Sequence, residues 1–439
     1  MKLDFKNMDV ATFDFRFLRA LMVTGTGGAE INECLQILAK SKGNSDESWI
    51  HEWGTMAEKV EREAEQAIRS GRTITARGAY LRASNYYRTA MFSLPPTDGR
   101  LDKYVRSNRE CFQKAVKLFS LPIETVEIPF GEARLPGYFL SAGQRRAPTL
   151  IAMNGGDSTN EEMVHWIGFA AMERGWNCLV FEGPGQWSAF QLNPQMTLRI
   201  DYEVPTKAVV DYLLRRDDVD PDKIALIGWS LASLLAARTV AFEKRICACI
   251  LVGGPVVDVN EAWEAVWPPV LQKTISPGIF DRLFALMEKL SPQLAGFVNH
   301  YYWIFNVSKP HELIEAWRPF NIKGLAPKIQ CPLLIMNGEA EYAQTDAKTI
   351  LSTMRFFSEL TCPVEIHEFS YAEGWAASHC QMGALSAAQA VIFKWLDKVV
   401  IKKDTSPRTD KRYDWQLLRK YHHNAEMEKL TRDIHIGRF

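Results

Sequence analysis

A short stretch at residues 223–233 constrains the fold of this chain more than any other. Residues 224–227 form an apolar run with isoleucine at both ends, which predicts a buried parallel strand. The chain then turns through Gly-Trp-Ser-Leu-Ala around Ser230, and residues 234–237 favour a helix. A strand, a tight turn with a central serine and a helix are typical of a nucleophile elbow. The alternative is an ordinary Gly-Ser turn between two core elements.

The segments around the elbow alternate between strand and helix patterns. The predicted strands are 125–128, 135–140, 148–153, 177–181, 224–227, 246–252, 332–336 and 364–369. The first two favour an antiparallel pair, and predicted helices at 161–173, 205–215 and 387–399 separate or follow the others. This alternation predicts an α/β fold with a mostly parallel, doubly wound sheet.

The first 120 residues show only helical patterns. They contain five helical segments, at 13–23, 30–39, 49–70, 73–92 and 101–119. We therefore expect an N-terminal helical cap domain at 1–120 and a catalytic domain at 121–402. The helical domain is also expected to form part of the pocket wall, because it carries Tyr86, Tyr87 and Arg88.

A second helical region interrupts the alternation at about 255–328, and it is rich in aromatic residues. Ligands bind at the carboxyl ends of the strands in such sheets, so we predict a lid there. The alternative is a structural layer whose aromatic side chains fill its own core. Residues 403–439 form a charged tail with a predicted helix at 413–432, and its histidines are expected to be solvated: His422, His423 and His435.

Charge and cysteine usage argue against several functional classes. The 439 residues include 52 Lys and Arg and 52 Asp and Glu, so no electrostatic case exists for nucleic acid or an anionic membrane. The N-terminal segment does not resemble a secretory signal, and no uncharged apolar stretch is long enough to span a bilayer. The eight scattered cysteines indicate a reduced cytoplasmic protein without a disulfide framework or a zinc site.

A serine nucleophile needs a base to take its proton and an acid to orient that base. In an α/β-hydrolase, the chain order is serine, acid, histidine. His379 follows the last predicted strand and precedes the last helix, so it is the candidate base. The acid should follow strand 332–336, where Glu341 stands three residues after a glycine. Glu339 and Asp346 remain the alternatives.

Such a site also needs donors for the oxyanion that forms on the substrate. One donor should be the backbone N–H of Leu231, directly after the nucleophile. The second should come from the Asn-Gly-Gly-Asp turn after strand 148–153, where Gly156 is the candidate and Gly155 and Asp157 are its neighbours.

Several motifs beyond the elbow are similar to one branch of the α/β-hydrolases. That branch holds FrsA-like proteins, 2,6-dihydroxypseudooxynicotine hydrolase and fungal pigment-pathway polyketide hydrolases. The matching segments lie in both the helical domain and the catalytic domain, at 48–53, 80–88, 135–139, 154–157, 182–186 and 374–381. Three positions depart from the branch's pattern. Ala232 replaces the second elbow glycine, Glu341 stands where an aspartate is usual, and Trp187 stands where a glycine is common.

The resemblance implies an α/β-hydrolase fold with a helical domain packed over the active site. It also implies a small-molecule substrate, no metal or organic cofactor, and often a homodimer. Ser230 and His379 fall on the branch's nucleophile and base. The resemblance further implies substrates that contain a 1,3-diketone or a related polyketide group of secondary metabolism. Such a substrate would be cleaved at a carbon–carbon bond.

We therefore expect a serine hydrolase that cleaves a carbon–carbon bond of the 1,3-diketone type, or an ester or lactone bond, in a polyketide-like molecule. One alternative is a hydrolase-fold enzyme that catalyses a non-hydrolytic cyclisation or elimination. Another is a binding protein without catalysis. The presence of serine, acid and histidine in the expected order argues against the last.

Overall fold

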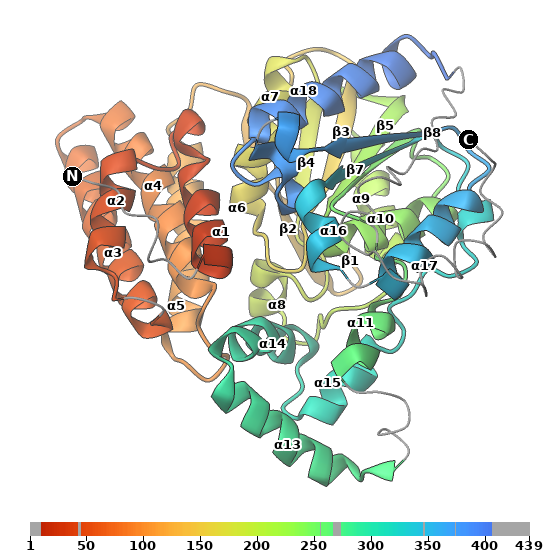
Figure 1. Cartoon of the computed structure of the whole chain (residues 1–439). Coiled ribbons are helices and arrows are strands. Elements are labelled where there is room, and N and C mark those ends of the chain that lie inside the picture. The colour runs from red at the N-terminus through yellow and green to blue at the C-terminus, as the bar shows by residue number, and fades with distance from the viewer. Residues whose placement is uncertain are drawn as a thin grey trace.

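The computed structural model describes residues 10–42, 45–254, 256–266, 274–345, 347–373 and 375–405. The predicted tail helix at 413–432, its three histidines and Asp346 lie outside these residues. Figure 1 shows a sheet between helices, with a bundle of helices from the N-terminal region beside it.

One eight-stranded sheet forms the centre of the molecule, in the order β1-β2-β4-β3-β5-β6-β7-β8. The first two pairings, β1 with β2 and β2 with β4, are antiparallel, and all other pairings are parallel. The predicted mostly parallel sheet is therefore confirmed. The strands are β1 Ile123–Phe130, β2 Ala133–Leu140, β3 Ala147–Met153, β4 Asn177–Phe181, β5 Val219–Trp229, β6 Ala248–Val252, β7 Leu333–Gly338 and β8 Val364–Phe369.

Successive residues of the central strands enter two different cores. Ala225 and Ile227 of β5 pack into one core, whereas Ile224 and Leu226 pack into the other. Both faces of these strands are buried because helices cover both, which explains the continuous apolar runs in the sequence. The helices of the sheet region are α6 Asn160–Met163, α7 Phe169–Glu173, α8 Trp187–Leu192, α9 Glu203–Leu213, α10 Leu231–Phe242, α16 Glu339–Gln344, α17 Ala347–Ser358 and α18 Leu385–Leu396.

The N-terminal region is helical throughout its described part, as predicted. Its helices are α1 Val10–Leu21, α2 Ile31–Lys40, α3 Asp46–Arg69, α4 Thr73–Met91 and α5 Arg100–Val116, with a short 3₁₀ turn between α1 and α2. In Figure 1, α1 lies on the side of this bundle that faces α6 and the sheet. The side chains of the bundle share one continuous core with one face of the sheet. The bundle is thus packed onto the sheet rather than tethered beside it.

The segment between β6 and β7 is also helical, with α11 Val259–Val266, α13 Pro277–Leu290, α14 Pro292–Phe305 and α15 Pro310–Trp317. Many of its aromatic side chains pack on one another: the Trp317 ring contacts those of Tyr301, Phe305 and Phe320 at centroid distances of 4.8–5.0 Å. The insertion also reaches the sheet region, because Trp303 stacks on Trp187 of α8 at 5.2 Å. Figure 1 shows α14 next to α8, below the sheet.

Candidate active site

Ser230 lies in the tight turn between β5 and α10, at the carboxyl end of a central strand. Its backbone has φ 55° and ψ −122°, a conformation that non-glycine residues rarely adopt. Its N–H donates to the carbonyl of Val252 at 2.8 Å, and its own carbonyl accepts the N–H of Ser233 at 2.8 Å. These hydrogen bonds hold a strained turn, and this strained geometry is what presents the serine of a nucleophile elbow.

The small residues on either side of Ser230 allow β5 and α10 to pass close together. A Cβ atom on Gly228 would lie 2.2 Å from the carbonyl oxygen of Ala232. Since that neighbour is a backbone atom, it cannot turn aside, and only glycine fits. Ala232 is fully buried, so a methyl group is accommodated on the helix side of the elbow.

His379 lies in the loop after β8, and its ring reaches the serine. Its Nε2 is 3.0 Å from the Oγ of Ser230. The loop bends sharply at Cys380, which has φ 55°. It also passes against the end of β7, because a Cβ on Gly338 would lie 2.1 Å from the carbonyl oxygen of Ala377. The histidine is thus placed by a close backbone crossing.

Glu341 lies on the short helix α16, directly after β7, and its carboxylate faces His379. Glu341 Oε1 is 3.2 Å from His379 Nδ1. Glu339, the first alternative acid, accepts the backbone N–H of Tyr371 at 2.8 Å instead. The structure therefore brings Ser230, His379 and Glu341 together, and it leaves Glu339 in a different contact.

Opposing effects act on the imidazole of His379. Burial lowers its pKa, but the neighbouring Cys380 and Glu341 raise it, and the net pKa is well above the ordinary value. A neutral imidazole can accept a proton at Nε2 only while Nδ1 keeps its hydrogen. Glu341 is an acceptor for that hydrogen, so it favours the tautomer that a base at Ser230 requires.

The turn after β3 approaches the serine from the other side. A Cβ on Gly155 would lie 3.5 Å from the Cβ of Ser230. The Gly155 N–H donates to the Oγ of Ser158 at 2.7 Å, so it is already used. Among the described residues, the Gly156 N–H has no acceptor. Leu231 is the first residue of α10, so its backbone N–H has no acceptor within that helix.

A buried glutamine fixes the direction of the Gly156 N–H. The Nε2 of Gln186 donates to the carbonyl of Asn154 at 2.5 Å and to that of Gly155 at 3.2 Å. Because a peptide unit is planar and trans, the Gly156 N–H must point away from the Gly155 carbonyl. Gln186 therefore orients the one N–H of this glycine pair that has no acceptor in the described chain.

Two aromatic residues hold the rest of the turn. His300 Nε2 lies 2.5 Å from the carbonyl oxygen of Gly156, and Trp187 Nε1 donates to that of Asp157 at 2.8 Å. Their rings lie 4.4 Å apart. Burial lowers the pKa of His300, so the ring is neutral and donates its Nε2–H to the carbonyl. Trp187 stands where the branch commonly has glycine, and its indole N–H makes a hydrogen bond to the turn that a glycine could not make.

Comparisons with known proteins identify the family. The family model described as "Esterase FrsA-like" matches residues 31–266. The 20-hydroxy-prefusarin hydrolase FUS2 of Gibberella moniliformis is 30% identical, and the match covers 89% of this chain and 97% of that protein. The chain belongs to the FrsA-like esterase family. Hydrolase acrC of Aspergillus aculeatus is also 30% identical to this FrsA-like chain, over 88% of the chain and 96% of the fungal protein.

A solved structure supports the fold. The crystal structure of 2,6-dihydroxy-pseudo-oxynicotine hydrolase matches the FrsA-like protein with a TM-score of 0.69 and 21% identity, over 89% of this chain and 97% of that one. At this identity the likeness concerns the fold alone, and it confirms the predicted α/β-hydrolase fold. The branch predicted from the sequence motifs is confirmed by the family match and the two relatives.

Helix α1 of this FrsA-like protein reaches the site. The Phe15 ring lies 6.5 Å from the His379 ring. Tyr86 and Tyr87 of α4, by contrast, are fully buried, and their hydroxyls donate to carboxylates of the same helical bundle. Tyr86 and Tyr87, two of the residues that motivated the prediction that the helical domain forms part of the pocket wall, therefore do not carry it. Helix α4 is enclosed by α3 and α5, so its aromatic side chains fill the bundle instead.

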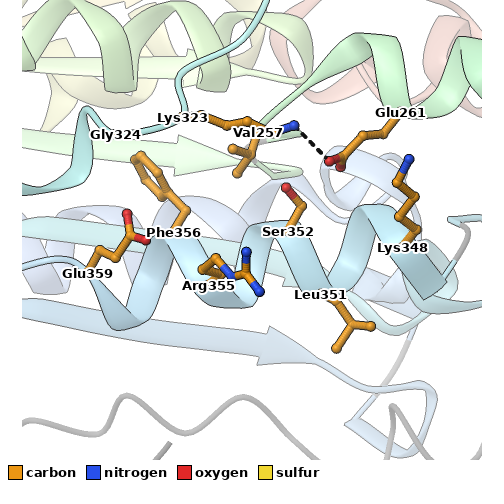
Figure 2. Close-up of a pocket in the computed structure, with 10 residues that line it drawn as sticks. All are labelled: Val257, Glu261, Lys323, Gly324, Lys348, Leu351, Ser352, Arg355, Phe356 and Glu359. Carbon is orange, nitrogen blue, oxygen red and sulfur yellow. Dashed lines mark ion pairs between the residues drawn. The ribbon is translucent and has the colours of Figure 1, made fainter. Parts of the chain in front are cut away.

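Two cavities flank α17. The smaller, of about 120 Å³, is lined by Glu341 and His379 together with Gly253 and Gly254. The larger, of about 450 Å³, lies between the start of the insertion and α17, and its lining includes the ion pair of Lys323 and Glu261 at 3.0 Å (Figure 2). The larger cavity has neither Ser230, His379 nor Glu341 in its lining. Of these two cavities, the smaller is the one bordered by Glu341 and His379, and Ser230 is not in its lining.

Three further observations bear on the predicted chemistry. Across the described ranges, no group of three or more His, Cys, Asp or Glu side chains is arranged to hold a metal ion. Each of the eight cysteines has a free thiol. Of the helices within the described ranges, none has the length and apolar character needed to cross a bilayer.

Proposed function

We propose that this protein is a serine-dependent hydrolase in which Ser230 is the nucleophile, His379 the general base and Glu341 the orienting acid. The supporting observation is the line of contacts from Ser230 Oγ to His379 Nε2, at 3.0 Å, and from His379 Nδ1 to Glu341 Oε1, at 3.2 Å. Both distances are short enough for the roles assigned. The three residues follow β5, β7 and β8, whose carboxyl ends meet at one edge of the sheet.

The first chemical step is attack of the Ser230 oxygen on a substrate carbonyl carbon. A carbon–oxygen bond forms, His379 Nε2 takes the hydroxyl proton, and the carbonyl electron pair moves to oxygen. The N–H groups of Leu231 and Gly156 donate to that oxyanion. The leaving group departs with the proton from His379 and leaves an acyl-serine. A water molecule, activated by the same imidazole, then hydrolyses the acyl-serine and restores Ser230.

The same site can cleave a carbon–carbon bond when the leaving group is a stabilised carbanion. In a 1,3-diketone, the carbon between the two carbonyls leaves as an enolate, because the second carbonyl accepts its negative charge. His379, protonated in the first step, returns the proton to that enolate. An ester or lactone leaves as an alcohol through the same steps. The bond that is cleaved is thus decided by the substrate that the pocket admits.

We propose a polyketide-like small molecule as the substrate. Membership of the FrsA-like family and the name of one relative, 20-hydroxy-prefusarin hydrolase, support a substrate of natural-product type. The side chains beside the turn after β3 are aromatic, namely Trp187, His300 and Tyr301. Aromatic surroundings support an unsaturated or apolar substrate. A Cβ on Gly156 would lie 2.9 Å from the hydroxyl of Tyr301, so this tyrosine of α14 borders the proposed oxyanion position.

A fluorophosphonate probe tests the nucleophile. We expect covalent labelling of the wild-type chain at Ser230, found by mass spectrometry of the tryptic peptide, and none of Ser230→Ala. Turnover by Ser230→Ala should fall by about 10³-fold or more. An unlabelled wild-type protein, or a Ser230→Ala variant with normal turnover, would exclude the triad and favour a binding protein.

Product analysis tests the reaction class. A panel of 1,3-diketones, lactones and aryl esters is incubated with the wild-type chain, and products are identified by mass. Hydrolysis adds one water molecule to the substrate. A diketone or an ester is then split into two fragments, whereas a lactone gives a single ring-opened product. A product that is isomeric with its substrate, or that has lost a small molecule without addition of water, would instead show a cyclisation or an elimination.

A further inference from the structure

Arg19 of helix α1 contacts the oxyanion turn directly. Its side chain is buried, and its Nη1 lies 3.0 Å from Asp157 Oδ2. Its Nη2 lies 3.5 Å from the backbone carbonyl of Asp157. Asp157 immediately follows Gly156, so a helix 138 positions away in the sequence holds the turn that carries the proposed oxyanion donor.

The same guanidinium also binds the far end of this turn. Arg19 Nε and Nη2 donate to the two carboxylate oxygens of Glu162 at 2.8 and 2.7 Å, the bidentate geometry that suits a planar guanidinium. Glu162 also closes a capping box with Thr159 at the start of α6. Arg88 of α4 adds a contact to Glu162 at 2.8 Å. One side chain therefore spans the turn from Asp157 to the helix that follows it.

The charges of this cluster balance, with two arginines against two carboxylates. Burial raises the pKa of Asp157, but Arg19 and Arg88 lower it, and the net value is about 2. Burial lowers the pKa of Arg19, but Asp157 and Glu162 raise it to above the ordinary value. Arg19 and Asp157 therefore both stay charged across the neutral pH range, so their ion pair is permanent and is not a pH switch.

We propose that Arg19 is a positioning residue through which the helical domain sets the oxyanion hole. The inference rests on the proposed function, because it needs an oxyanion to develop beside Gly156. Donors stabilise a transition state most when they are oriented before the charge develops. Two consecutive glycines leave the turn conformationally free, so a rigid partner at Asp157 has a large effect on where the Gly156 N–H points. Gln186, His300 and Trp187 bind the carbonyls of Gly155, Gly156 and Asp157, and Arg19 adds the contact to the Asp157 side chain.

Arg16 provides a matched control. It lies one turn earlier on the same helix and is also buried, but it binds Asp46 and Ser93 within the helical bundle. The experiment compares Arg19→Met with Arg16→Met on an aryl ester that the wild-type chain hydrolyses. It measures kcat, KM and the inhibition constant of a trifluoromethyl ketone, which adds to the serine and carries a negatively charged oxygen.

For Arg19→Met we expect kcat to fall by about 10²-fold, in the range for loss of one oxyanion donor. The ketone should bind more weakly by about the same factor, while KM changes by less than about threefold, because the ground-state ester makes no contact with the oxyanion donors that the transition state needs. Arg16→Met should keep kcat and ketone affinity within about threefold of the wild type. A purely structural role for Arg19 would lower the amount of folded enzyme and so the apparent kcat, but it would leave the ketone affinity and the kcat per active site, counted by fluorophosphonate titration, at the wild-type values.

Removal of Arg19 leaves the buried carboxylate of Glu162 and the partly exposed one of Asp157 with less compensation, which can prevent folding. Asp157→Asn keeps the shape of the turn and the pair of Arg88 with Glu162, and it should show the same separation with a smaller loss. The proposal is overturned if either folded variant keeps the wild-type kcat and ketone affinity, or if Arg16→Met loses as much as Arg19→Met. Failure of the proposed function would look different, because the wild-type chain would then not react with fluorophosphonate at Ser230.

Discussion

At the residue scale, the proposed role of His379 as the base for Ser230 depends on its contact with Glu341. Glutamate is one methylene longer than the aspartate usual at this position, and α16 places it on a short helix that starts directly after β7. Glu339 lies two residues earlier, and side chains two apart on a helix do not face the same way. This geometry explains why Glu341, and not Glu339, meets the imidazole at 3.2 Å.

Replacement of Glu341 by glutamine should separate charge from shape. We predict a fall in kcat of about 10²- to 10⁴-fold for Glu341→Gln, because the amide cannot stabilise the imidazolium that forms. Glu339→Gln and Asp346→Asn are the controls and should be nearly silent. Steady-state kinetics on the same substrate checks this. A silent Glu341→Gln beside a damaging Asp346→Asn would move the acid to Asp346 and leave Ser230 and His379 in place.

The pH dependence of kcat/KM should report His379. Its pKa is raised above the ordinary value, so the ring is protonated and inactive as a base at low pH, and activity should rise as the pH passes through that pKa. Glu341→Gln removes one of the groups that raise the pKa, so the residual activity should show its acid limb at lower pH than the wild type. A limb that stays in place, or moves to higher pH, would contradict this assignment.

At the element scale, the crossing of β5 and α10 sets the exposure of Ser230. The turn keeps a non-glycine residue at φ 55° because hydrogen bonds from β6 and from the first turn of α10 hold both sides. The crossing is so close that a backbone carbonyl occupies the place of a side chain at Gly228. The conformation of the turn at Ser230 therefore requires glycine at position 228, because a Cβ there would clash with α10.

Gly228→Ala should destabilise the fold strongly. The added methyl would meet the carbonyl of Ala232 at 2.2 Å, so strand or helix must shift, and we predict a loss of about 3 kcal/mol or more in the free energy of unfolding. Gly78→Ala is the control. It lies in α4 with only the tip of Arg82 at 3.8 Å, and it should gain about 0.5–1 kcal/mol from helix propensity. Denaturant titration compares the two, and a neutral Gly228→Ala would disprove the close crossing.

At the scale of the whole molecule, the helical bundle and the sheet behave as one packed unit. Phe112 of α5 contacts Tyr138 of β2 at 5.0 Å, and Phe119 contacts Phe169 of α7 at 5.8 Å. The ion pairs of Arg19 and Arg88 with Glu162 join the same two parts. If the bundle were removed, the apolar surface that it buries on the sheet region would face water, and the protein would lose solubility.

A chain that starts near residue 122 should therefore be insoluble or inactive. It would expose the surfaces of β1, α6 and α8 that α4 and α5 contact, and it would lose Arg19 and Phe15. Soluble yield, thermal unfolding and aryl-ester turnover of the truncated chain check this expectation. A soluble truncation with full activity would show that the bundle is an independent module, and it would also contradict the role of Arg19.

The sequence alone determined the sheet, the elbow and a short set of candidates for the site. These features have local signals, since strand period, turn chemistry and chain order are read within a few residues or along the order of elements. Ser230 and His379 are predicted in this way, and Glu341 is one of three candidate acids. Only the tertiary structure decided that Glu341 faces His379, that Tyr86 and Tyr87 lie inside the bundle, and that His300 and Arg19 contact the turn after β3. Arg19 and Asp157 lie 138 positions apart, and no local pattern encodes a contact that forms only when two separate layers pack together.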